Sequence, residues 1–172
     1  MNTECFRHAM YFGLVLGALF IIHFMFSISD IWVISSLQFL MKLVIPVVAV
    51  YFCIDCRKRI NDNLFTYSQA FRYFLQLFVA ASLICSAFIF MYVKWINVDF
   101  LLELKEKTFD SMEKLSSILG SFNITESEME EALNNAYTTN SFVSSNFLSN
   151  IVVGIIVAIV GSFIVRNNKN QS

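Results

Sequence analysis

The sequence predicts an all-α integral membrane protein, a four-helix bundle with an extracytoplasmic helical insert between the third and fourth membrane spans. Two observations lead to this prediction. The chain of 172 residues is 57% apolar and only 15% charged, whereas soluble domains are near half apolar and a quarter charged. Its apolar residues also gather in four long segments, and a longer acidic segment separates the last two. We expect a single membrane domain over residues 1–172.

Each of the four apolar segments is long enough to cross a bilayer as a helix, which takes about 20 residues. A core helix of a soluble protein would instead carry a polar stripe at helical spacing. Residues 151–165 are apolar on every side apart from two glycines and a serine. No small-residue cleavage site follows the first segment, so we expect it to be a retained span and not a signal peptide. The predicted spans are residues 9–26, 31–54, 71–95 and 142–165.

Lysine and arginine residues fix the predicted orientation, because short positively charged loops stay in the cytoplasm. Basic residues lie before span one, between spans two and three, and after span four: Arg7, Arg57, Lys58, Arg59, Arg166 and Lys169. With four spans, these three regions share one side of the membrane. The loop at 99–141 holds nine acidic residues and three lysines. Both termini are therefore predicted to be cytoplasmic and this loop extracytoplasmic.

Two capping boxes predict where helices begin outside the apolar segments. Thr66 and Gln69 have the spacing of a capping box at the start of span three. In the external loop, apolar residues recur at three- and four-residue steps from Leu101 onward, which indicates an amphipathic helix, either separate or continuous with span three. Thr125 and Glu128 form a second box, which predicts a short acidic helix to about residue 137. We expect this insert to pack on the lipid bilayer or to bind a protein partner.

Cysteine and histidine residues near the predicted cytoplasmic face offer one candidate site. Cys53 and Cys56 have the CxxC spacing of dithiol oxidoreductases and of half a zinc site. An oxidoreductase is not favoured, because the pair lies beside basic residues on the reducing side. Cys5 and His8, one helical turn apart, could complete a tetrahedral zinc site with this pair. The alternative is that these cysteines act as small apolar residues at helix ends. We assign no metal and no cofactor.

Three polar residues lie well inside the predicted spans: Lys42, His23 and Gln76. A lysine in mid-membrane costs about 3 kcal/mol on insertion scales, and such residues often serve transport. Lys42 could instead extend its amine toward the headgroups. Both interpretations stay open.

Small residues at four-residue spacing predict close helix packing. Gly13 and Gly17 supply this pattern on span one, and span four carries Gly154, Ala158 and Gly161. The simplest interpretation is packing within the bundle, and homo-oligomerisation through these faces is the alternative.

Four short segments resemble one known family when they are taken in order: FTYSQAF at 65–71, INVDF at 96–100, SEME at 127–130 and GIIV at 154–157. The chain is similar over nearly its whole length to the small bacterial membrane proteins catalogued as domain of unknown function 4199. This resemblance implies four spans, a helical insert and a bacterial inner-membrane location. Relatives often have proline where this chain has Val98, and the CxxC is not a shared feature. The family has no established activity, so no catalytic residue is carried over.

No catalytic constellation can be assembled from the sequence, which lacks a glycine-rich phosphate loop, a paired-histidine metalloprotease motif and a serine–histidine–acid set. Positive charge is confined to the membrane flanks, so nucleic-acid binding is not expected. We predict a non-enzymatic structural, scaffold or accessory subunit. The alternatives are a small transporter or channel component that uses Lys42, and a thiol or metal sensor that uses Cys53 and Cys56.

Overall fold

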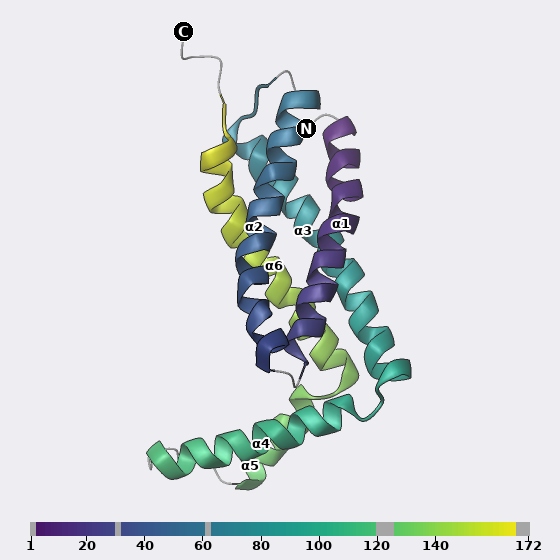
Figure 1. The fold of residues 1–172 in the computed structure, drawn as a ribbon, viewed down its shortest axis with the longest axis vertical. Coiled ribbons are helices and arrows are strands. Elements are labelled where there is room, and N and C mark those ends of the chain that lie inside the picture. Colours follow the sequence, from purple (N-terminus) through teal and green to yellow (C-terminus); the bar gives the residue numbers. More distant parts are fainter. Residues whose placement is uncertain (1–2, 30–31, 61–62, 120–125, 168–172) are drawn as a thin grey trace. The chain divides into compact units, whose positions relative to one another are not determined.

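The computed structural model describes residues 3–29, 32–60, 63–119 and 126–167 (Figure 1). The predicted all-α fold class is confirmed, since the described residues form helices and only one isolated β-bridge. The helices are α1 (Thr3–Ser27), α2 (Trp32–Ile60), α3 (Tyr67–Met91), the π-helix η1 (Tyr92–Ile96), α4 (Phe100–Leu119), α5 (Glu126–Ala136) and α6 (Thr139–Val165).

Four helical segments are long and apolar enough to cross a membrane, as the sequence predicted: Thr3–Ser27, Leu37–Ile60, Tyr67–Ile96 and Thr139–Val165. Only 22% of the second segment's most apolar window and 50% of the third's are buried. The outward faces carry large apolar side chains such as Leu43, Val47 and Ile156. Exposed apolar area on this scale needs a covering partner, and lipid fits helices of this length.

The chain divides into two compact units. The first unit contains residues 1–85 and 147–172, and the second contains residues 86–146. Within the first unit, α1, α2, most of α3 and most of α6 run side by side (Figure 1).

Glycines bring α1 and α6 close to α3 in the first unit. A Cβ atom built on Gly13 would lie 2.6 Å from the Cβ of Ala80, and one on Gly17 would lie 3.0 Å from that of Ile84. On α6, a Cβ on Gly154 would lie 2.6 Å from the Cβ of Phe78. The predicted small-residue faces are thus used inside the chain, with α3 as the shared partner.

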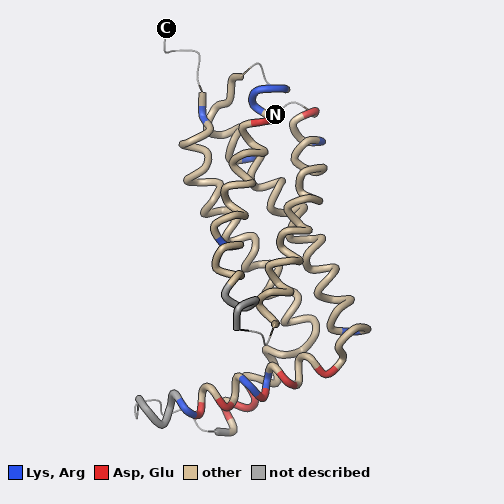
Figure 2. The backbone as a smooth tube through the Cα atoms, in the orientation of Figure 1, with Lys and Arg blue, Asp and Glu red and all other residues tan. Residues whose placement is uncertain are grey.

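Hydrogen bonds hold the loop before α3 to the end of α6. The predicted capping box forms, because the Thr66 amide donates to Gln69 Oε1 at 2.9 Å and the Gln69 amide donates to Thr66 Oγ1 at 3.3 Å. Phe65 and Asn167 exchange two backbone hydrogen bonds of 3.0 and 2.8 Å. Arg57 Nη1 donates to the Val165 carbonyl at 2.7 Å and so satisfies an end carbonyl of α6. Figure 2 shows basic residues on the last turn of α2, at this same end of the first unit.

The helix type changes within the second unit, after the last turns of α3. The Asn97 amide donates to the Tyr92 carbonyl at 2.8 Å, which is the i→i+5 bond of a π-helix. The backbone leaves the helix at Asn97, and α4 begins at Phe100. The amphipathic helix is therefore separate from span three. The ring of Phe100 packs edge-on against Tyr92 at 5.5 Å and Phe142 at 5.8 Å between centroids.

Helices α4 and α5 pair within the second unit. Lys105 Nζ donates to Asn134 Oδ1 at 2.6 Å, and the hydroxyls of Thr108 and Tyr137 lie 2.9 Å apart. The Leu133 side chain is 7% exposed. The predicted second cap residue, Thr125, lies outside the described residues, but α5 begins directly after it. Acidic residues run along both helices (Figure 2).

Candidate functional site

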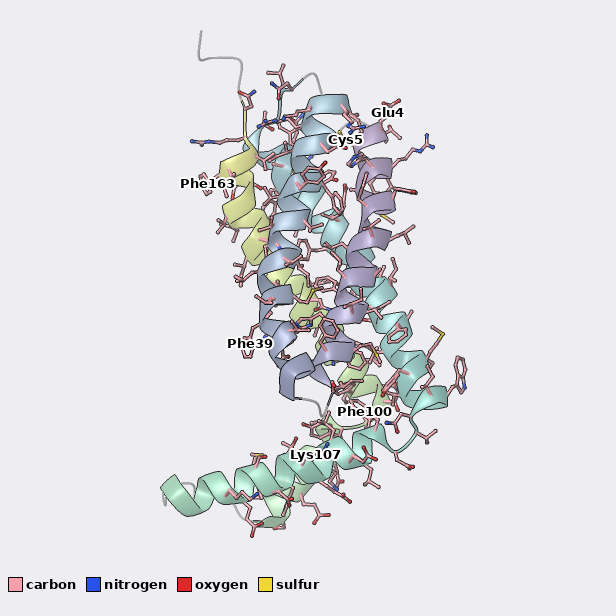
Figure 3. The ribbon with its side chains drawn as sticks, in the orientation of Figure 1. Glu4, Cys5, Phe39, Phe100, Lys107 and Phe163 are labelled. Carbon is pink, nitrogen blue, oxygen red and sulfur yellow. The ribbon has the colours of Figure 1, made fainter. Side chains whose placement is uncertain are left out.

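Side chains of α1, α2 and α3 meet at the basic end of the first unit. Cys5 and His8 lie three residues apart on α1 and so share one face. We call the group the basic-end cluster, and its members are Cys5, His8, Cys53, Asp55, Cys56 and Tyr73. Figure 3 labels Cys5 beside Glu4 at the start of α1.

A chain of hydrogen bonds runs through this cluster from carboxylate to imidazole to phenol. Asp55 Oδ2 lies 3.2 Å from His8 Nε2, and His8 Nδ1 lies 2.8 Å from the Tyr73 hydroxyl. Tyr73 is fully buried, and its hydroxyl also lies 3.2 Å from the Phe52 carbonyl oxygen. The second Asp55 oxygen pairs with Arg59 Nε at 2.6 Å. Three helices are joined by polar contacts that their apolar faces could not supply.

The Tyr73 hydroxyl has one hydrogen and two acceptors within reach, so two hydrogen arrangements are consistent with this geometry. When Tyr73 donates to His8 Nδ1, the imidazole is neutral and its Nε2 hydrogen points to Asp55. When Tyr73 donates to the Phe52 carbonyl, His8 Nδ1 must itself be a donor. The direction in which the phenol donates therefore decides whether His8 Nδ1 accepts or donates a hydrogen bond.

Two cysteine sulfurs from different helices are in direct contact in the same cluster. Cys5 Sγ lies 2.7 Å from Cys56 Sγ, and both side chains are 1% exposed or less. Cys53 is also fully buried one turn before Cys56. All the cysteines are free thiols. The structure thus brings Cys5 and His8 to the helix end that carries Cys53 and Cys56, but it pairs Cys5 with Cys56 and directs His8 to Asp55 and Tyr73.

The predicted tetrahedral arrangement of three thiols and His8 does not form. Within the part of the chain that the structure describes, no group of three or more histidine, cysteine or acidic side chains could hold a metal ion. His8 Nε2 faces Asp55 and His8 Nδ1 faces Tyr73, so neither ring nitrogen is left for a metal shared with the sulfurs.

Asp55 and Tyr73 are the cluster members that sequence reasoning missed. They lie 47 and 65 residues from His8, and no local pattern connects positions so far apart. Asp55 did carry one signal, since it is an acid between two cysteines at the end of an apolar segment. Such a charge needs a partner when it is only 17% exposed.

An open depression borders the cluster on α1. Its volume is about 450 Å³, and its lining residues are Glu4, Arg7, His8, Tyr11 and Phe12. The side chains of His8 and Asp55 are 11% and 17% exposed, so both polar groups connect the cluster with the outside.

The polar residues predicted inside the spans lie in different surroundings. Lys42 is exposed on α2, with Nζ 5.2 Å from the centre of the Phe39 ring. Figure 3 shows Phe39 pointing away from the neighbouring helices. His23 Nε2 and Gln76 Oε1 are instead buried, and neither atom has a hydrogen-bond partner among the described residues. Lys42 therefore lies on the outer surface, one turn from an aromatic ring, and does not line an internal path.

The second unit has a depression of its own beside the α4–α5 pair. Its volume is about 250 Å³, and Leu101, Leu102, Lys105, Asn134 and Tyr137 line it. Lys105 also lies 4.0 Å from Glu130. The depression is therefore bordered by a cation whose partners belong to the same unit.

Comparison with known proteins places the chain in a family. The family model described as "Protein of unknown function (DUF4199)" matches residues 7–167. This range includes the basic-end cluster apart from Cys5, and all of the second unit. No curated protein and no solved structure matches the chain. Because the match covers nearly the whole sequence, the chain belongs to the DUF4199 family.

Proposed function

We propose that this chain is a non-enzymatic protein of the bacterial inner membrane, in which a four-helix bundle anchors an extracytoplasmic contact element. The contact element is the α4–α5 pair, and its occupant is a protein partner. The chain would then act as a scaffold or accessory subunit.

The observation that carries this proposal is the internal closure of the α4–α5 pair. Lys105 on α4 is engaged by Asn134 on α5, and Thr108 on α4 is engaged by Tyr137, directly after α5. Leu133 is turned inward. The pair is thus preformed, and its ordering cost is met before a partner binds. Its exposed charged residues are mostly acidic, and Leu102 and Met112 are exposed apolar side chains among them.

Charge placement supports the proposed orientation. Arg7, Arg57 and Arg166 all belong to the first unit, at the end where α2 and α6 finish. The positive-inside rule puts this end in the cytoplasm. The membrane-length helices α3 and α6 then lead to an insert on the opposite side.

We propose a non-enzymatic role because the two depressions lack a nucleophile paired with a base. Neither of the two depressions described above brings a serine, threonine or cysteine nucleophile together with a base. Lys42 gives transport little support, because its side chain is exposed on α2 beside the ring of Phe39.

Site-specific photo-crosslinking in intact cells tests the contact role. A photoreactive residue is placed at Glu106 or at Glu131, both exposed on the insert, and at Lys58 as an exposed control on the basic end. We expect a protein adduct of one defined mass from both insert positions and none of that mass from Lys58. The adduct should weaken when Lys105→Ala and Tyr137→Phe are combined to open the pair. The proposal would be refuted if both insert positions gave lipid adducts and no protein adduct.

A further inference from the structure

We propose that Cys5 and Cys56 form a thiol pair that a small hydroperoxide oxidises to a disulfide, which joins the start of α1 to the end of α2. The two sulfurs are 2.7 Å apart with nothing between them. A covalent S–S bond is about 2.05 Å long, so closure requires a movement of well under one ångström. This inference goes beyond the contact role of the insert and does not depend on it.

Helix geometry selects this pair over the CxxC pair that the sequence suggests. Cys53 and Cys56 both lie inside α2. Side chains three residues apart on an α-helix have Cβ atoms about 5–6 Å apart, whereas a disulfide needs about 3.5–4.5 Å. A bond between Cys53 and Cys56 would therefore distort the last turns of α2. A bond between Cys5 and Cys56 joins two separate helices and leaves both intact.

The oxidation balances as a two-step reaction. The sulfur of one thiol attacks the distal oxygen of the hydroperoxide while its proton passes to the leaving oxygen. An S–O bond forms, the O–O bond breaks, and a sulfenic acid and an alcohol or water result. The second sulfur then attacks the first, the S–S bond forms, the S–O bond breaks, and water leaves. The two sulfurs lose two electrons in total, and the hydroperoxide gains them.

Burial determines which oxidants can reach the pair. Cys5 is 1% exposed and Cys56 is fully buried. A bulky disulfide such as oxidised glutathione cannot align with either sulfur, because exchange requires in-line access to the attacking thiol. A hydroperoxide of a few atoms, without charge, needs much less space to align with a sulfur than a glutathione disulfide does. The pair is therefore selective for small peroxides, and the reducing cytoplasm keeps it as thiols until such an oxidant appears.

The disulfide would lie at the same helix end as the hydrogen bonds that join Asp55, His8 and Tyr73. Cys56 follows Asp55, and Cys5 lies one turn before His8. Oxidation would therefore fix covalently the α1–α2 contact that His8 and Asp55 hold by a hydrogen bond. The reduced and oxidised proteins should differ in the freedom of α1 at this end.

Counting thiols on the purified full-length protein in detergent tests the inference. The protein is treated with hydrogen peroxide, quenched, denatured and labelled with a polyethylene-glycol maleimide. The four thiols of the untreated chain should fall to two, with the lost pair recovered on reduction. Cys5→Ser should keep all three of its thiols, whereas the matched control Cys53→Ser should fall from three to one. Oxidised glutathione at the same concentration should leave four.

Peptide mapping of the unmutated protein gives a result that does not depend on how the variants fold. Mass spectrometry after peroxide treatment should find the Cys5 and Cys56 peptides joined within one chain, with the loss of two hydrogens. The inference is wrong if all four thiols persist, if the mapped bond joins Cys53 to Cys56, or if it links two chains. Equal thiol loss with oxidised glutathione would overturn the proposed selectivity.

Discussion

At the scale of single residues, the hydrogen bond between His8 and Tyr73 is expected to stabilise the fold. Tyr73→Phe removes the hydroxyl and leaves His8 Nδ1 without its partner at 2.8 Å. Stranding a buried polar group in this way costs about 1–3 kcal/mol. Thermal unfolding of the detergent-solubilised protein should show the loss.

A second substitution separates the contribution of the His8–Tyr73 hydrogen bond to stability from the other effects of losing the hydroxyl. His8→Phe and Tyr73→Phe should be non-additive in the double variant, with a coupling of about 0.5–3 kcal/mol. Strictly additive losses would mean that the two side chains stabilise the protein separately.

Arg57 and Arg59, two residues apart on α2, have different partners. Arg57 donates to the Val165 carbonyl at 2.7 Å, whereas Arg59 is 74% exposed and pairs with Asp55 one turn away. Arg57→Ala should lower the free energy of unfolding by about 1.5–3 kcal/mol, the value of a hydrogen bond to a charged group. Arg59→Ala should cost only about 0.3–0.5 kcal/mol. Chemical denaturation of both variants checks the order, and equal losses would show that Arg57 does not cap α6.

At the scale of helices, two glycines of α6 offer a comparison of packing tolerance. A Cβ on Gly154 would meet the Cβ and Cγ of Phe78 at 2.6 Å, close to the backbone of α3. A Cβ on Gly161 would meet the tip of the Phe74 ring at 2.8 Å and Val50 Cγ2 at 3.4 Å. Gly154→Ala must push the helices apart and should cost about 1–3 kcal/mol, while a ring tip can turn aside.

The readout for this pair is the melting temperature in detergent together with the yield of folded protein. Gly154→Ala should be clearly the less stable of the two. A more damaging Gly161→Ala would show that the ring of Phe74 is held in place as firmly as a backbone.

Local signals predicted the helices well. The Thr66 and Gln69 box forms because both partners lie within one turn, and span lengths follow from bilayer thickness. The break at Asn97 was harder, because Val98 stands where relatives often have proline. An apolar residue there lets the helical pattern run on without interruption. The structure shows the break through the π-type bond from Asn97 to Tyr92 and through the non-helical backbone at Asn97.

At the scale of the whole molecule, the proposed topology predicts which positions a membrane-impermeant reagent can reach. Glu106→Cys on the insert should react with an impermeant maleimide in spheroplasts. Lys58→Cys should react only after the membrane is permeabilised. The native cysteines are at most 2% exposed, so the parent protein supplies the background. Labelling of Lys58→Cys in intact spheroplasts would reverse the orientation.

Contacts between distant parts of the chain set the limit of sequence-based prediction. Residue type alone singled out Cys5, His8, Cys53 and Cys56, because few side chains share their chemistry. Which sulfur contacts which, and that His8 faces Asp55 and Tyr73, depends on how α1, α2 and α3 rotate about their axes. That rotation is set by glycine contacts such as Gly13 against Ala80. Spacing within one segment does not encode it.

The π-helix at Tyr92–Ile96 has a consequence for how this family can change length. A five-residue hydrogen-bonded step takes up one residue more than an α-helical step. Deleting one residue, such as Lys94, would let the segment return to α-helical bonding and remove only the residue that the wider step absorbs. Phe100 should then keep its place against Tyr92. A relative that is one residue shorter between these two rings should therefore have an α-helical turn where this chain has the π-helix.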